Sequence, residues 1–383
     1  MGERTHLLDL DLAALEDRFE ADGLPRYRAR QVLEWVYHKF ARSFDEMTNL
    51  PLELRTKLAG VYHIRTSTVA RRAGASDGVV KWLLQWPDGA ACECVLIPDG
   101  DRRTACISSQ VGCPVGCVFC ASGLDGLERN LTCGQIVEQA LLVARVCALG
   151  DDDPASPADD GVTRGAAVTT DDAATARLSN VVFMGAGEPL ANYGPVLRAI
   201  RTLHADWGLG LGARRITLST VGLPSQIRRL ADENLPINLA LSLHAPNEAL
   251  RRRIIPWAAL TPLSELIDAC RHYFERSGRE ITLEYILLGG VNDGASHAEE
   301  LARFTRQVRC NVNLIRYNPV DPLPYARPTA EAAKRFQEVL RARGVNAHLR
   351  RSRGLDIDAA CGQLRRRTLT AQRVQVTVAR EES

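Results

Sequence analysis

The 383-residue sequence contains no apolar run long enough to cross a membrane, so it does not indicate an integral membrane protein. Its first residues also lack the basic start and apolar middle of a secretion signal, and we therefore expect a cytoplasmic location. The sequence has little excess of charge of either sign, because its formal net charge is only +2. Bulk electrostatics therefore do not indicate a nucleic-acid partner.

The composition that is present is that of a soluble globular protein, with 45% hydrophobic and 25% charged residues. Basic residues occur in clusters, which suit contact with phosphates but equally suit solvated surface charge. These basic positions are Arg71-Arg72, Lys81, Arg102-Arg103, Arg214-Arg215, Arg251-Arg252-Arg253 and Arg365-Arg366-Arg367.

The chain has eleven cysteines, and a cytoplasmic compartment keeps thiols reduced. Crowded cysteines therefore indicate metal or redox chemistry rather than disulfides. Cys147, Cys270 and Cys310 lie apart from one another in apolar helical or strand-like contexts. We predict that these three are small core residues.

Hydrophobic periodicity divides the chain into four parts. Residues 1–60 have helical spacing and predict a small accessory domain, and residues 61–103 alternate over short runs that predict a β-rich connector. Strand and helix patterns alternate through residues 104–350, and residues 351–383 form a C-terminal segment. Repeated βα units favour an incomplete (β/α)6 barrel of TIM-like architecture, and a doubly wound open sheet is the alternative.

Six strands are predicted in the βα part, with helices between them. The strands are 104–109, 180–184, 215–219, 237–242, 281–286 and 312–316, and the helices include 133–149 and 263–277. Residues 150–178 are rich in Asp, Ala and Thr and have almost no large apolar side chain. Such a segment buries too little surface to become ordered, so it predicts a disordered surface insertion.

Cys113, Cys117 and Cys120 follow one another with the spacing C-x3-C-x2-C. This is neither a paired zinc-ribbon arrangement nor a Cys-His finger, although a zinc site or structural thiols remain alternatives. Three thiolates suit a [4Fe-4S] cubane whose fourth iron stays open for a chelating small molecule. Gly112 and Gly116 allow the loop to wrap closely around such a cluster.

Four short polar motifs each follow a predicted strand. They are "MGAGEPLANY" (184–193), "STVG" (219–222), "SLHAP" (242–246) and "YNP" (317–319). Taken singly, each could be a turn, a helix cap or a satisfied polar group. Together they lie where a β/α barrel carries its active site, and they predict a ligand site there.

With these motifs, the chain resembles the RlmN/Cfr family of radical S-adenosylmethionine RNA methyltransferases, and most resembles its adenine-C2 branch. Further matching segments are "YRARQVLEWVY", "FDEMTNLP", "ECVLIP", "CISSQVGC", "RNLT", "RRITLST", "VNDG", "NLIRYNP" and "RGLDIDAACGQL". The resemblance implies a radical S-adenosylmethionine barrel. It also implies methylation of C2 of an adenosine in the peptidyl-transferase region of 23S rRNA, and in many members of adenosine 37 in tRNA.

The resemblance also assigns roles to three residues. Cys361 matches the cysteine that is first methylated on sulfur, Cys106 matches its partner in a transient disulfide, and Glu93 matches the proton acceptor. The resemblance also implies that two molecules of S-adenosylmethionine are consumed per turnover. Without the resemblance, each of these residues would be read as a packed or surface residue.

For the cofactors, the resemblance places the [4Fe-4S] cluster on Cys113, Cys117 and Cys120. The S-adenosylmethionine contacts that it implies are Gly187, Glu188, Ser219, Ser242, Leu243, His244 and Asn318. It further implies a monomer that takes electrons from flavodoxin or ferredoxin, with the N-terminal helices helping to hold the RNA.

Two other functions remain open on the sequence. One is C8 methylation of the same adenosine, as in the Cfr branch, and the other is a non-catalytic, zinc-stabilised RNA-binding protein. The chain also departs from the family pattern in its acidic insertion, at Leu127 and at Val221. These departures leave the choice between rRNA, tRNA or both open.

Overall fold

The computed structural model describes residues 4–150, 177–354, 357 and 363–366. The predicted methyl carrier Cys361 and nearly all of the predicted insertion lie outside these residues. Within the described part, no helix combines the length and the apolar character that a membrane crossing requires.

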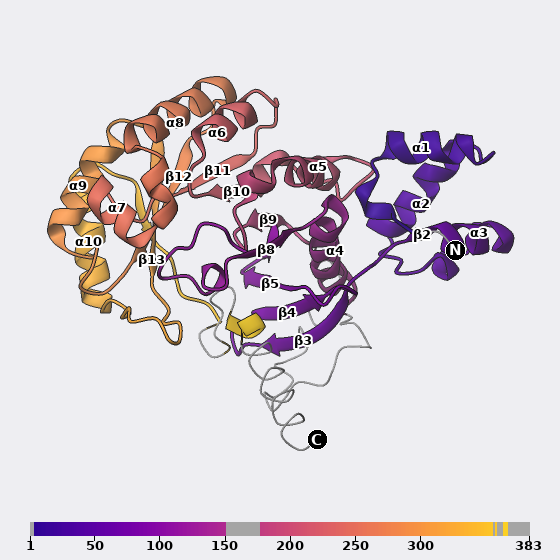
Figure 1. Cartoon of the computed structure of the whole chain (residues 1–383), viewed down its shortest axis with the longest axis horizontal. Coiled ribbons are helices and arrows are strands. Elements are labelled where there is room, and N and C mark those ends of the chain that lie inside the picture. The colour runs from indigo at the N-terminus through magenta and orange to yellow at the C-terminus, as the bar shows by residue number, and fades with distance from the viewer. Residues whose placement is uncertain (1–3, 151–176, 355–356, 358–362, 367–383) are drawn as a thin grey trace, which may run out of the picture.

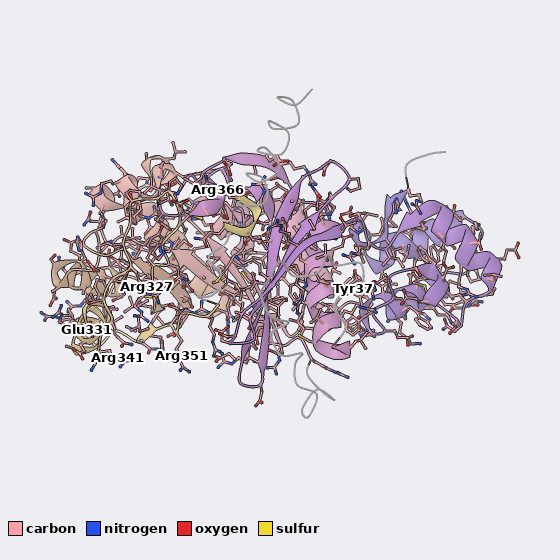
Figure 2. All side chains as sticks on the ribbon, turned by 90° about the horizontal axis from the view of Figure 1, so that it is seen from below. Tyr37, Arg327, Glu331, Arg341, Arg351 and Arg366 are labelled. Carbon is pink, nitrogen blue, oxygen red and sulfur yellow. The ribbon has the colours of Figure 1, made fainter. Side chains whose placement is uncertain are left out.

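Three helices form a lobe at one end of the molecule (Figure 1). They are α1 (Leu12–Ala21), α2 (Tyr27–Tyr37) and α3 (Leu52–Val61), and short strands β1 (Thr5–His6) and β2 (Tyr62–His63) pair beside them. The apolar face predicted for α2 is confirmed, since Val32, Leu33 and Val36 are buried. The ring of Tyr37 lies 6.0 Å from that of Trp207, at the junction with the rest of the molecule (Figure 2).

The centre of the molecule is a ten-stranded sheet with the order β14-β13-β12-β11-β10-β9-β6-β5-β4-β3. Its parallel strands are β6 (Arg102–Cys106), β9 (Asn180–Phe183), β10 (Ile216–Thr220), β11 (Asn238–Ser242), β12 (Ile281–Leu287), β13 (Cys310–Arg316) and β14 (Ala347–Leu349). These strands follow one another in chain order without reversal. A doubly wound sheet reverses its order at a switch point, so the observed order is that of a barrel.

Helices follow the parallel strands and cover the outside of the sheet (Figure 1). They are α4 (Cys133–Leu149), α5 (Tyr193–His204), α6 (Pro224–Ala231), α7 (Glu248–Ile254), α8 (Leu263–Ser277), α9 (Ala295–Thr305) and α10 (Ala330–Ala342). Their apolar faces and the strands form one large core. Cys147 and Cys270 are buried in this core and Cys310 packs against it, as predicted.

Three antiparallel strands extend the sheet beyond β6: β3 (Thr68–Gly74), β4 (Val80–Gln85) and β5 (Ala91–Asp99). Successive side chains of a strand point to opposite faces. Trp82 and Cys94 therefore face the large core, whereas Glu93 and Val95 face the other side, where Val95 pairs with Cys106. The predicted connector is thus continuous with the barrel sheet, and the domain limits stay a prediction.

Candidate radical S-adenosylmethionine site

The three clustered cysteines lie in the loop between β7 (Gln110–Gly112) and β8 (Leu127–Asn130). The backbone N–H of Cys113 donates to the carbonyl of Gly126 at 2.9 Å, which closes the loop. Gly112 has a positive φ of 76°, and a Cβ there would lie 2.0 Å from the same carbonyl oxygen. Only glycine fits this turn.

The thiols of the loop lie in an apolar setting. Burial raises the pKa of Cys113 to about 12 and that of Cys117 well above its usual value, and the nearby Cys120 raises both further. Val115, Phe119 and other apolar side chains of this loop pack with those of the neighbouring loops. Buried thiols become thiolates when metal binding supplies compensating positive charge, so the donor set fits an iron–sulfur cluster.

No group of three or more His, Cys, Asp or Glu side chains in the described residues is arranged to hold one metal ion. This geometry does not conflict with a cubane, because each thiolate of a cubane binds a different iron. The three cysteines of such a site surround the cluster without converging on one point.

Glu188 joins the loops that follow β9 and β10. Its Oε1 accepts from the backbone N–H of Leu190 at 2.9 Å, and its Oε2 accepts from that of Val221 at 2.7 Å. Burial raises the pKa of this carboxyl to about 7, and the backbone donors lower it in part. The side chain of Thr220 also hydrogen-bonds to this carboxylate. The two oxygens together offer about four lone-pair sites, so the group can still accept from an ammonium group of a ligand.

Gly187 lets the chain pass close to the loop after β6. Its φ is 105°, and a Cβ there would lie 2.7 Å from both Ser109 Oγ and Gln110 Cβ. Substitution by alanine therefore adds crowding to backbone strain.

We expect Gly187→Ala to lose more free energy of unfolding than Gly89→Ala, by about 1–3 kcal/mol. Gly89 is the matched control because its φ is also positive, at 83°, but a Cβ there meets nothing within 4 Å. Urea unfolding of both purified variants measures the difference. Equal losses would show that the crowding has no effect.

The ends of β10 and β11 and the loops after β11 and β13 carry the remaining predicted cofactor contacts. Ser219 Oγ and Ser242 Oγ lie 3.2 Å apart across β10 and β11, and Leu243 is fully buried. Asn318 follows β13, and its Oδ1 accepts from the guanidinium of Arg327. All of them lie at the carboxyl ends of parallel strands, the edge that carries barrel active sites.

His244 is held as a neutral ring. Its Nδ1 accepts from the backbone N–H of Ile286 at 3.1 Å, so the ring proton lies on Nε2. Burial lowers the pKa to about 3, and the nearby Arg251 lowers it further. The ring packs edge-on to that of Phe119, in the cysteine loop, with 5.2 Å between centroids. His244 therefore contacts the cysteine loop and offers one N–H donor, at Nε2.

Glu93 lies at a small hollow that several of these loops share. The hollow is lined by Glu93, Gly112, Ala121, Ser122, Ala186, Arg365 and Arg366. These residues come from β5, the cysteine loop, the loop after β9 and the C-terminal segment. A larger cavity, between the N-terminal helices and α4, is lined by none of the predicted site residues.

Cys106 is buried on the same sheet face as Glu93, in an apolar cluster with Ala75, Val79 and Val95. Ile357 packs against this cluster from the C-terminal segment. The backbone N–H of Arg365 donates to Glu93 Oε1 at 2.9 Å. Residues on both sides of position 361 therefore contact the surroundings of Cys106 and Glu93.

Three of the basic residues singled out in the sequence are buried rather than exposed. Lys81, Arg251 and Arg365 are buried, so they are neither free phosphate contacts nor solvated charges. Arg251 donates to the carbonyl of Val221, beside the predicted cofactor loop. A lone lysine inside the apolar run "VVKWLLQW" was the one available signal for Lys81.

Comparison with known proteins agrees with this architecture. The family model for the ribosomal RNA large subunit methyltransferase N-terminal domain matches residues 5–64. A radical SAM methyltransferase from Sphaerobacter thermophilus is 46% identical, with a TM-score of 0.85 over 94% of this chain and 98% of that one.

Two curated relatives also cover nearly the whole chain. The probable dual-specificity RNA methyltransferase RlmN of Thermosynechococcus vestitus is 47% identical over 95% of this chain and 99% of its own length. The corresponding protein of Rhodopirellula baltica is 44% identical over 95% of this chain and 91% of its own length.

Fold and cysteine loop together define a radical S-adenosylmethionine methyltransferase, and the predicted fold class is confirmed. The chain belongs to the RlmN family of RNA methyltransferases. S-adenosylmethionine and an iron–sulfur cluster are therefore its cofactors, and RNA is its substrate. The protein is therefore an enzyme and not a non-catalytic RNA-binding protein.

Proposed function

We propose that the protein methylates C2 of adenosine in the peptidyl-transferase region of 23S rRNA and at position 37 of tRNA, with Cys361 as the methyl carrier. The observation that supports this most is the shared hollow at Glu93. It borders the cysteine loop, the loop that precedes Gly187 and the segment that follows Cys361. The proton acceptor Glu93, the source of the radical and the methyl carrier Cys361 would meet there.

A radical route suits this target. C2 of adenine is an electron-poor ring carbon bearing hydrogen, so it does not attack an ordinary sulfonium methyl group. When bound, one [4Fe-4S] cluster and S-adenosylmethionine supply a 5′-deoxyadenosyl radical. Cys113, Cys117 and Cys120 would hold the cluster. The S-adenosylmethionine would be held by Gly187, Glu188, Ser219, Ser242, Leu243, His244 and Asn318.

The chain's own residues then carry the methyl group and release the product. Cys361 takes a methyl group from one S-adenosylmethionine and loses a hydrogen atom from it when a second is cleaved. The resulting carbon radical bonds to C2 of the adenine ring. The adduct then gives up one electron, which the oxidised cluster would accept, and Glu93 accepts the proton from C2. Cys106, once its thiol has lost its proton, attacks the sulfur of Cys361. A disulfide forms while the sulfur–carbon bond breaks, and the departing carbon keeps the electron pair and takes up a proton to become the methyl group.

The N-terminal lobe offers a surface for the RNA. Tyr27 is 56% exposed, with the Arg28 guanidinium 5.0 Å from its ring centre, and the ammonium of Lys39 lies 4.1 Å from the ring centre of Trp35. Aromatic and basic side chains of this kind contact bases and phosphates. Arg26 contributes less, because it is paired with Asp17 and two glutamates. A flavodoxin or ferredoxin as reductant, a monomeric state and a cytoplasmic location stay predictions.

Mass spectrometry of nucleosides distinguishes this proposal from C8 methylation. The protein is reconstituted without oxygen and incubated with S-adenosylmethionine, a reductant and either a 23S rRNA fragment or tRNA. We expect 2-methyladenosine in both RNAs, and none with Cys361→Ala. Detection of 8-methyladenosine would overturn the C2 assignment, and product in only one RNA would overturn the dual choice of substrate.

A further inference from the structure

Lys81 is a fully buried lysine on the sheet face that carries Glu93 and Cys106. Its side chain has 0% exposure, and its Nζ lies 3.2 Å from Glu93 Oε2. Burying an ammonium group is unfavourable unless a negative partner lies close by. Glu93, which lines the hollow, is therefore a charge partner that Lys81 contacts from behind the lining.

We propose that Lys81 is a positioning residue, which holds Glu93 ionised and aimed into the hollow so that Glu93 can accept the proton of the RNA adduct. The inference rests on the proposed role of Glu93. The family resemblance described above assigns no role to Lys81.

The strand register explains how the two side chains meet. Lys81 pairs with Val95, and Val95 pairs with Cys106, so these three residues form one row across β4, β5 and β6. Glu93 is two residues before Val95 and therefore points to the same face, diagonal to Lys81. The sheet itself fixes the ammonium group beside the carboxylate.

The carboxylate of Glu93 is held on both of its oxygens. Lys81 contacts Oε2, and the backbone N–H of Arg365 donates to Oε1 at 2.9 Å. The Arg365 guanidinium is directed elsewhere, to Glu128 at 2.6 Å. Lys81 thus contacts Glu93 through its side-chain cation, whereas Arg365 holds the other oxygen through its main chain.

A purely stabilising role is a weaker account of this pair. A buried ion pair often contributes less to stability than apolar side chains of similar volume would. The same face of the sheet carries an apolar cluster, in which Val79 and Val95 pack with Cys106. A lysine at this position is better explained by what it does to the carboxylate.

The chemical step needs an ionised carboxylate. In that step the carbon–hydrogen bond of the adduct breaks, a bond forms between the proton and a Glu93 oxygen, and the electron pair stays in the ring. The ammonium of Lys81 stabilises the carboxylate before the transfer. With an apolar residue there, the buried carboxylate loses the positive charge that offsets its removal from water.

The test measures adduct resolution in the full-length, reconstituted protein. Lys81→Met, Lys81→Gln and Lys81→Arg are compared with Glu93→Gln and with Lys334→Met. Lys334 is the matched control because its partner, Glu338, is also a glutamate, 3.8 Å away, but both side chains are mostly exposed. Three quantities are followed: methylation of Cys361, the amount of RNA-linked protein and the rate of free product.

We expect Lys81→Met and Lys81→Gln to keep Cys361 methylation but to accumulate RNA-linked protein, with product release slowed roughly 100-fold or more. Lys81→Arg should restore release to within about tenfold, because it returns the positive charge. Lys334→Met should match the unmodified protein. A merely structural lysine would lower methylation and release together.

Two results separate this inference from the proposed function. If Glu93→Gln stalls while Lys81→Gln releases product as fast as Lys81→Arg, the role of Lys81 is wrong and that of Glu93 stands. If Glu93→Gln itself releases product at the normal rate, the role of Glu93 fails first. Should Lys81→Met not fold, the comparison of Lys81→Gln with Lys81→Arg still decides.

Discussion

Replacing Cys113 by alanine should remove the iron–sulfur cluster and with it all RNA methylation. Anaerobically purified protein is expected to be brown and to contain about four irons per chain. The cluster depends on three thiolates in one short loop, so the loss of one leaves two irons of the cubane without a protein ligand. Iron analysis and absorbance in the visible range should therefore fall to near background.

Cys310→Ala is the matched control for this experiment. Cys310 is also partly buried, and burial raises the pKa of its thiol to about 12, as it does for Cys113. It lies on β13, however, and packs against the large core. Its removal should leave the iron content unchanged. Full iron content in Cys113→Ala would contradict the assignment of the cysteine loop.

Replacing Cys106 by alanine should stop the reaction after the RNA has become attached to the protein. Cys361 should still be methylated, and its carbon should still bond to adenine, because neither event uses Cys106. Without the second thiol no disulfide can form, so the sulfur–carbon bond persists. Denaturing gel electrophoresis with labelled RNA should show covalent protein–RNA adduct, with free product reduced by a large factor.

Cys94→Ala controls for the loss of a buried thiol nearby. Cys94 is fully buried on the neighbouring strand β5 but faces the large core, opposite to Cys106. It should release product at the normal rate and form no stable adduct. Normal product release by Cys106→Ala would reject its role in resolving the adduct.

Much of the barrel could be predicted because its elements are long and periodic. The predicted helices 133–149 and 263–277 coincide with α4 and α8, and all six predicted strands are present with small shifts at their ends. The strand β14 was not predicted. It has only three residues and exists because β13 pairs with it, which leaves no periodic pattern in the sequence.

The candidate site was predictable only in part. The cysteine spacing and the polar motifs after strands indicated which loops gather at one edge, because those motifs are local. The burial of Arg251 and Arg365 left no local pattern, and that of Lys81 left only its place in an apolar run, because a charge is buried only when a distant partner meets it. Lys81 meets Glu93 across a strand pair, and Arg251 meets the carbonyl of Val221, which is 30 residues away in the chain.

Deuterium transfer from labelled S-adenosylmethionine tests the central claim, that the methyl group passes through Cys361 and loses a hydrogen atom there. The reconstituted protein is given RNA and S-adenosylmethionine whose methyl group carries three deuterium atoms, and the nucleosides are analysed by mass spectrometry after several turnovers. We predict that the methyl group of 2-methyladenosine retains two of the deuterium atoms and that 5′-deoxyadenosine gains one. A product that keeps all three, with no deuterium in 5′-deoxyadenosine, would contradict the account.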